Sequence, residues 1–158
     1  MQDQNATDLA DPISGQVIDR LHDRASALVE AIDLAGDIVI IPAPVLAEYL
    51  IGIDRKALQA HLDIINSVNC IEVVSFDQVA AIECALLIDD AELKMLDPLA
   101  TKAKLRVDRQ ILAIAKAAGA KQLWTHDKGL YNKAKALNLD VRSLGDIEPK
   151  PEQQNIPF

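Results

Sequence analysis

Aromatic residues and cysteines are scarce in this chain of 158 residues. Half of the residues are apolar, yet only five are aromatic, so the core has to be built from Ala, Val, Ile and Leu. That composition suits α/β folds, in which helices cover a Val- and Ile-rich parallel sheet. The length allows one domain with a sizeable core and is too short for two ordinary domains.

Long apolar runs and targeting signals are also missing. The longest apolar stretch, residues 38–53, is interrupted by two prolines and Glu48, and it falls short of the roughly 20 residues that span a bilayer. The chain opens with polar residues, and Cys70 and Cys84 form no Cys-x-x-Cys pair. We therefore expect no membrane segment, a reducing environment and a cytoplasmic location.

Several kinds of site have no motif to support them. There is no Gly-rich phosphate loop, and the three histidines lack zinc-ligand spacing with the cysteines. Neither cysteine lies in a motif typical of a nucleophile. His126 follows a predicted strand, where a turn histidine is the expected role. These absences leave carboxylate chemistry as the main candidate.

The net charge of -8 argues against a nucleic-acid partner, but the charges are unevenly distributed. Residues 1–93 carry 4 Lys/Arg against 17 Asp/Glu, and residues 94–142 carry 11 against 4. This basic half could face a polyanion, or it could be a solvated helix surface. Its members include Lys94, Lys102, Lys104, Arg106, Arg109, Lys116, Lys121 and Lys128.

Hydrophobic spacing predicts helices and strands that alternate along residues 16–147, between a polar segment at 1–15 and a Pro-rich tail at 148–158. This order is typical of an open parallel sheet flanked by helices, whose ligands gather at the carboxyl ends of the strands. We expect the helix at 45–52 to be buried and residues 89–101 to form a mobile surface connection. The predicted helices cover residues 17–34, 45–52, 55–68, 78–88, 105–118 and 128–137, and the predicted strands cover 37–42, 71–76, 121–125 and 140–144.

Three carboxylates occupy positions where such a sheet places its site. Glu48 is the single charged residue on its apolar helix, and either it binds a metal or it reaches water or pairs with an arginine. Asp108 lies early in a helix, where the helix dipole alone could favour it. Asp127 follows a strand directly, where it could simply cap the next helix.

Together the three carboxylates would suit Mg²⁺ or Mn²⁺, which prefer hard oxygen ligands. A bound cation would activate water and stabilise charge on a phosphate. We expect the three carboxyl groups to converge on one face of the fold. Without a metal, their mutual repulsion should raise the pKa of at least one of them.

The residues around these carboxylates resemble, in order, the second to fourth acidic motifs of PIN domains. The matching segments are Ile38-Val-Ile-Ile-Pro42-Ala-Pro-Val-Leu-Ala-Glu48, Leu105-Arg-Val-Asp108-Arg-Gln-Ile-Leu-Ala and Leu123-Trp-Thr125-His-Asp127. The resemblance covers about residues 17–147. It implies a metal-dependent ribonuclease with Glu48, Asp108 and Asp127 as Mg²⁺ or Mn²⁺ ligands, and with the Thr125 hydroxyl supporting the site. It also implies RNA as substrate, a homodimer, and an antitoxin partner if the protein is the toxin of a toxin-antitoxin pair.

The resemblance departs from the family pattern at the N-terminus. PIN domains begin with an apolar strand that lies in the middle of the sheet and ends in Asp-x-Asn or Asp-x-Ser. Asp3-Gln4-Asn5 has those letters, but only two residues precede it, so we expect the first strand and its carboxylate to be missing. Such a protein would be an impaired ribonuclease. The alternative is a non-catalytic PIN-like module that binds RNA or a protein.

Overall fold

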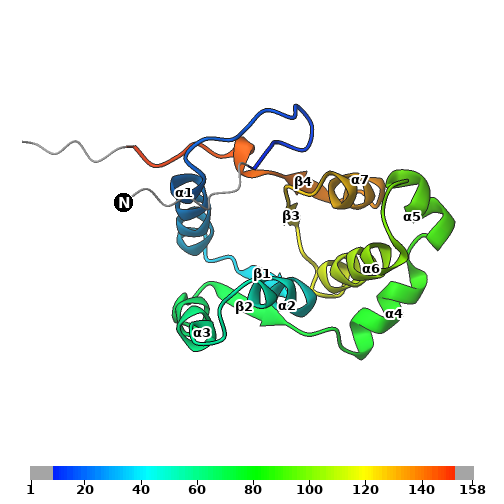
Figure 1. The fold of residues 1–158 in the computed structure, drawn as a ribbon, viewed down its shortest axis with the longest axis horizontal. Coiled ribbons are helices and arrows are strands. Elements are labelled where there is room, and N and C mark those ends of the chain that lie inside the picture. The colour runs from blue at the N-terminus through cyan, green and yellow to red at the C-terminus, as the bar shows by residue number, and fades with distance from the viewer. Residues whose placement is uncertain (1–8, 152–158) are drawn as a thin grey trace, which may run out of the picture.

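The computed structural model describes residues 9–151 as an α/β fold with two small parallel sheets (Figure 1). Its strands are β1 (Val39–Pro42), β2 (Ile71–Val74), β3 (Gln122–Trp124) and β4 (Asp140–Arg142). Its helices are α1 (Leu21–Leu34), α2 (Ala43–Ile51), α3 (Leu58–Ser67), α4 (Gln78–Leu86), α5 (Asp90–Leu96), α6 (Lys102–Ala117) and α7 (Lys128–Ala136), followed by the 3₁₀ turn Leu144–Asp146. The predicted α/β class and the parallel strand pairing are confirmed.

Each sheet contains two strands. β1 pairs with β2 from Val39 opposite Ile71 to Pro42 opposite Val74, and β3 pairs with β4 from Gln122 opposite Asp140. Within residues 9–151, no strand joins β1 to β3, and the two sheets lie apart in Figure 1. Among the described residues, the parallel strands therefore form two separate pairs instead of one continuous sheet.

Burial is concentrated in the second half of the chain. The main core cluster joins α6 and α7 to β3 and includes Ile111, Leu112, Leu123, Leu130 and Ala134. By contrast, α1, α2 and α3 contain no buried residue, and all four β1 residues are only half-buried. The half of the fold around β1 and β2 therefore leaves much of its apolar surface in contact with water.

Helix α6 links the two sheets. Thr101 caps its N-terminus by accepting a hydrogen bond from the Lys104 amide at 3.2 Å. Its buried residues include Leu105, Asp108, Leu112 and Ala115, a spacing of three to four residues that forms one helix face. The helix contacts α2 and β1 and also packs in the core cluster with Leu123 of β3. It consequently holds Asp108 close to both halves of the fold.

Three sequence-based expectations are wrong in detail. Residues 89–101 are not a mobile connection: they contain α5, capped by Asp89, and Leu93 is 1% exposed in a small second core cluster. Helix α2 is not buried, because Tyr49 and Ile51 are 46% and 84% exposed. Helix α1 begins at Leu21, and Val17 instead forms an isolated antiparallel bridge with Ala10.

Among residues 9–151, no helix is both long and apolar enough to cross a bilayer. Asp3-Gln4-Asn5 lies outside the described residues, as does most of the predicted C-terminal tail.

Candidate metal-binding site

Asp108 lies in the interior, on the seventh residue of α6, and is 4% exposed. Its Oδ2 atom accepts hydrogen bonds from Lys133 Nζ at 2.5 Å and from Lys104 Nζ at 3.2 Å. The helix dipole does not account for a carboxylate at position 108. Its effect is concentrated in the first turn of a helix, and Asp108 lies beyond the first turn of α6. Two ammonium groups provide the charge that a buried carboxylate needs.

Asp127 is the N-cap residue of α7, and each of its two carboxylate oxygens accepts a different hydrogen bond. Oδ1 caps the helix by accepting from the Leu130 amide at 2.8 Å, and Oδ2 accepts from Lys104 Nζ at 2.7 Å. The Asp127 amide donates to Thr125 Oγ1 at 3.1 Å, so the threonine hydroxyl fixes the turn that presents the carboxylate. The helix-cap interpretation of Asp127 is confirmed, and its role as a site residue stays a prediction.

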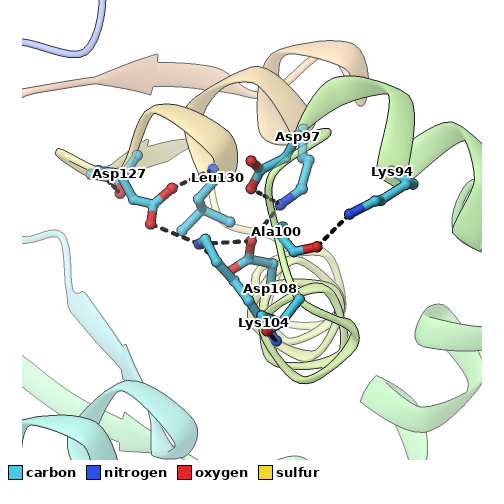
Figure 2. Close-up of polar contacts among 10 residues, drawn as sticks. Lys94, Asp97, Ala100, Lys104, Asp108, Asp127 and Leu130 are labelled. Carbon is cyan, nitrogen blue, oxygen red and sulfur yellow. Dashed lines mark hydrogen bonds and ion pairs between the residues drawn. The ribbon is translucent and has the colours of Figure 1, made fainter.

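Lys104 connects the two carboxylates, as Figure 2 shows. Burial acts to lower the pKa of Lys104, but hydrogen bonds and charge attraction from Asp127 and Asp108 outweigh it, so the pKa is raised. Burial likewise acts to raise the pKa of Asp127, and the hydrogen bonds from Lys104 and the Leu130 amide bring the net pKa below its ordinary value. The expected rise through carboxylate repulsion is not found at Asp127, because an ammonium group separates it from Asp108.

Sequence reasoning missed Lys133 and Asp97. The Lys133 side chain is 0% exposed, and its Nζ lies 2.9 Å from Asp97 Oδ2 as well as 2.5 Å from Asp108. A signal was present in the sequence: Lys133 lies three residues after Leu130 and four before Leu137, on the apolar face of α7. A charged residue in that position needs a buried partner.

Gly129 lets Asp97 approach the start of α7. A Cβ at this position would lie 2.1 Å from Asp97 Oδ2 and 3.2 Å from Asp127 Oδ1. The space occupied by the Asp97 carboxylate therefore exists only because residue 129 has no side chain. Asp97, Asp108 and Asp127 are joined through Lys133 and Lys104 into one chain of ion pairs.

Glu48 does not join this network. It is exposed on α2, although α2 packs against α6, the helix that carries Asp108. Across residues 9–151, no three His, Cys, Asp or Glu side chains are grouped so that they could hold a metal ion together. The structure therefore brings Asp108, Asp127 and Thr125 together and leaves Glu48 facing solvent on the neighbouring helix.

Most of the basic half is engaged in contacts within the chain. Arg109 donates to the carbonyl oxygens of Cys84 and Ile88, and Lys94 donates to that of Ala100. Lys116 and Lys121 pair with Glu83 and Asp37. Together with Lys104, these four residues make five of the eight basic residues named above that contact acidic side chains or carbonyl oxygens of the same chain. This weakens the interpretation of this half as one continuous surface for binding a polyanion.

His126 has a structural role. Its two ring nitrogens contact the Ala10 carbonyl oxygen and the Leu144 amide, each at 3.3 Å. The expected turn role agrees with these contacts, which tie the first described residues to the end of the fold.

The family model described as "PIN domain" matches residues 16–136, which is more than half of the chain. The chain belongs to the PIN domain family. The match contains Glu48, Asp108, Thr125 and Asp127, so the sequence-based family resemblance is confirmed.

Two further comparisons bear on this PIN domain. The crystal structure of VapBC2 from Rickettsia felis, bound to a DNA fragment from their promoter, is similar with a TM-score of 0.53 and 22% identity. The similarity covers 78% of this chain and 89% of the other, and at this identity it shows the fold alone. No curated protein matches the PIN domain described here.

Proposed function

We propose that this PIN domain is a Mg²⁺- or Mn²⁺-dependent ribonuclease whose metal is held by Asp108 and Asp127. The observation that carries the proposal is that these two carboxylates already share one cation, the ammonium group of Lys104, at 3.2 and 2.7 Å. Mg²⁺ is commonly bound through only one or two carboxylates while it retains several waters. The two oxygens therefore fit the chemistry of such an ion.

Each residue of the site would have a separate role in this reaction. Asp108 and Asp127 would hold the cation, which when bound supplies charge neutralisation at the scissile phosphate and activation of water. Thr125 would keep Asp127 in place through the Asp127 amide. Glu48, exposed on the helix packed against α6, lies outside the pair of carboxylates that would hold the cation.

The proposal extends to partners. By family resemblance the protein would be the toxin of a toxin-antitoxin pair, with RNA as substrate, an antitoxin as inhibitor, a homodimer as the working state and the cytoplasm as its location. The likeness to VapBC2, a complex seen on promoter DNA, supports an antitoxin partner. The exposed apolar side chains of Tyr49 and Ile51 offer surface for such an association.

The division of the described strands into two sheets supports weak activity. Within residues 9–151 no strand joins β1 to β3, α6 contacts elements of both halves, and two carboxylates would position the cation. A displacement of about 1 Å in a reacting group can cost on the order of 100-fold in rate. A version with an added N-terminal apolar strand ending in Asp-x-Asn should therefore cleave RNA faster.

The test is cleavage of one single-stranded RNA by both versions in Mg²⁺ or Mn²⁺. Asp108→Asn in the extended version should abolish cleavage, because it removes a charged ligand and keeps the shape. Asp33→Asn, which neutralises an exposed carboxylate on α1, is the matched control and should leave the rate unchanged. Cleavage that survives Asp108→Asn would refute the acidic-site mechanism.

A non-catalytic module that binds RNA or protein is the second candidate. The specific observation in its favour is that lysine ammonium groups neutralise both Asp108 and Asp127 without a metal. This candidate predicts that neither version cleaves RNA, and that RNA binding is equal with and without divalent cations.

A further inference from the structure

Lys104, on α6, differs from Lys133, the other lysine of the ion-pair network, because its side chain reaches water. Its side chain is 36% exposed, whereas that of Lys133 is 0% exposed. A lysine carries its charge on a flexible four-carbon stem, so the Lys104 ammonium can leave its partners by rotating its own side chain. Lys133 has no such route, because the core encloses it.

The position of the Lys104 ammonium is the position a shared cation would need. Mg²⁺ binds carboxylate oxygens at about 2.0–2.1 Å, so an ion bound to both Asp108 and Asp127 has to lie between their oxygens. Lys104 Nζ lies in that place, 3.2 Å from Asp108 Oδ2 and 2.7 Å from Asp127 Oδ2 (Figure 2). Two positive charges cannot share this space without strong repulsion.

We infer that Lys104 is a built-in competitor for the divalent cation. Displacement of the Lys104 ammonium toward solvent frees Asp127 Oδ2 and Asp108 Oδ1, which lie 2.7 and 3.4 Å from Lys104 Nζ. Lys133 stays bound to Asp97 and to the other oxygen of Asp108, Oδ2, and keeps Asp108 in position. Lys104 thereby lowers the metal affinity and keeps the two carboxylates neutralised when no metal is bound. This inference rests on the metal site of the proposed function.

The first test measures Mn²⁺ affinity from the paramagnetic resonance signal of free Mn²⁺. Lys104→Met, which keeps the stem and removes the charge, should bind Mn²⁺ roughly tenfold or more tightly than wild type. Lys104→Arg keeps the charge and should bind no more tightly than wild type. Lys102→Met, at the exposed first position of α6, changes the net charge equally and should leave the affinity within about twofold of wild type.

The second test follows the lysine itself. Reductive methylation of the wild-type protein, read by peptide mass spectrometry, should modify Lys104 several-fold faster at saturating Mn²⁺ than without metal. Modification of Lys133 should stay slow in both conditions, because its side chain is wholly buried.

The outcomes separate this inference from the proposed function. Equal Mn²⁺ affinity of wild type and Lys104→Met, or unchanged Lys104 methylation, overturns the competition and leaves the metal site standing. Absence of Mn²⁺ binding in both proteins overturns the site and the inference together. Binding by Asp108→Asn that equals wild type places the ion elsewhere and also overturns both.

Discussion

Replacement of Lys133 by Met tests whether the buried ion pairs hold the site together. The change removes an ammonium group that is 0% exposed and lies 2.5 Å from Asp108 and 2.9 Å from Asp97. Removal of one partner from a buried pair typically costs about 3–5 kcal/mol, because the other charge remains buried. Lys104 still contacts Asp108, so we expect the lower end, about 3 kcal/mol.

The free energy of unfolding would be measured by urea titration, followed by far-UV circular dichroism and by the fluorescence of Trp124, the only tryptophan. A loss of about 3 kcal/mol lowers the melting temperature of a domain of this size by roughly 6–12 °C. Lys128→Met, at an exposed position on the same helix, is the control and should change the free energy by less than about 0.5 kcal/mol.

A double-mutant cycle isolates the pair. Once Asp108→Asn has removed the buried negative charge, Lys133→Met should cost at least about 1 kcal/mol less than it does in wild type. If the two losses are additive, or if Lys133→Met alone costs under about 1 kcal/mol, then the ion pair does not stabilise the fold and the reasoning about Asp108 is refuted.

Three further predictions concern close packing and pH. Gly129→Ala should lower the unfolding free energy by about 1–3 kcal/mol, because its Cβ would lie 2.1 Å from Asp97 Oδ2 and one of the two must move. Leu93→Ala should cost about 2–5 kcal/mol in urea titration, because Leu93 is 1% exposed in the core. Hydrogen bonds from the Ser14 amide and then the Ser143 hydroxyl lower the pKa of Asp11 from 3.8 to about 2. Asp11 therefore stabilises the folded state above pH 4, and melting curves should show that contribution disappearing as pH falls from about 4 to 2.

Each of these three predictions has a control substitution. Gly52→Ala meets only an ordinary contact at 3.5 Å and should be nearly neutral, so an equal effect at Gly52 and Gly129 would contradict the packing argument. Leu99→Ala removes a side chain that is 96% exposed, and a cost as large as that of Leu93→Ala would contradict the burial of α5. Asp11→Asn should reduce the stability lost between pH 4 and 2, and a loss equal to that of wild type would exclude a contribution from Asp11.

Local patterns in the sequence were sufficient to predict most helices and strands. Asp77 directly precedes the predicted helix at 78–88, and its carboxylate caps α4 by accepting a hydrogen bond from the Ala80 amide at 2.9 Å. The β-branched run at 71–76 contains β2, and the pairing of β1 with β2 is parallel as expected. These features depend on neighbouring residues, whose preferences can be read directly from the chain.

The sequence-based predictions were wrong or incomplete where contacts join residues that are far apart in the chain. The charged segment 89–101 looks solvated, yet Leu93 and Ala100 are buried because α5 contacts α6 and α7. Lys133 contacts Asp97, 36 positions earlier, and no local pattern specifies that pair. The apolar helix α2 was expected to be buried, but burial requires a covering partner, and none of the described residues covers Ile51.

The position of a bound Mn²⁺ ion decides whether Asp108 and Asp127 form a metal site. Crystals of the protein soaked in Mn²⁺ would be examined by anomalous scattering at the manganese edge. We expect one peak within about 2–2.5 Å of a carboxylate oxygen of both Asp108 and Asp127, with Lys104 Nζ moved away from both. No peak at this position, with Lys104 still between the two carboxylates at a saturating Mn²⁺ concentration, would contradict it.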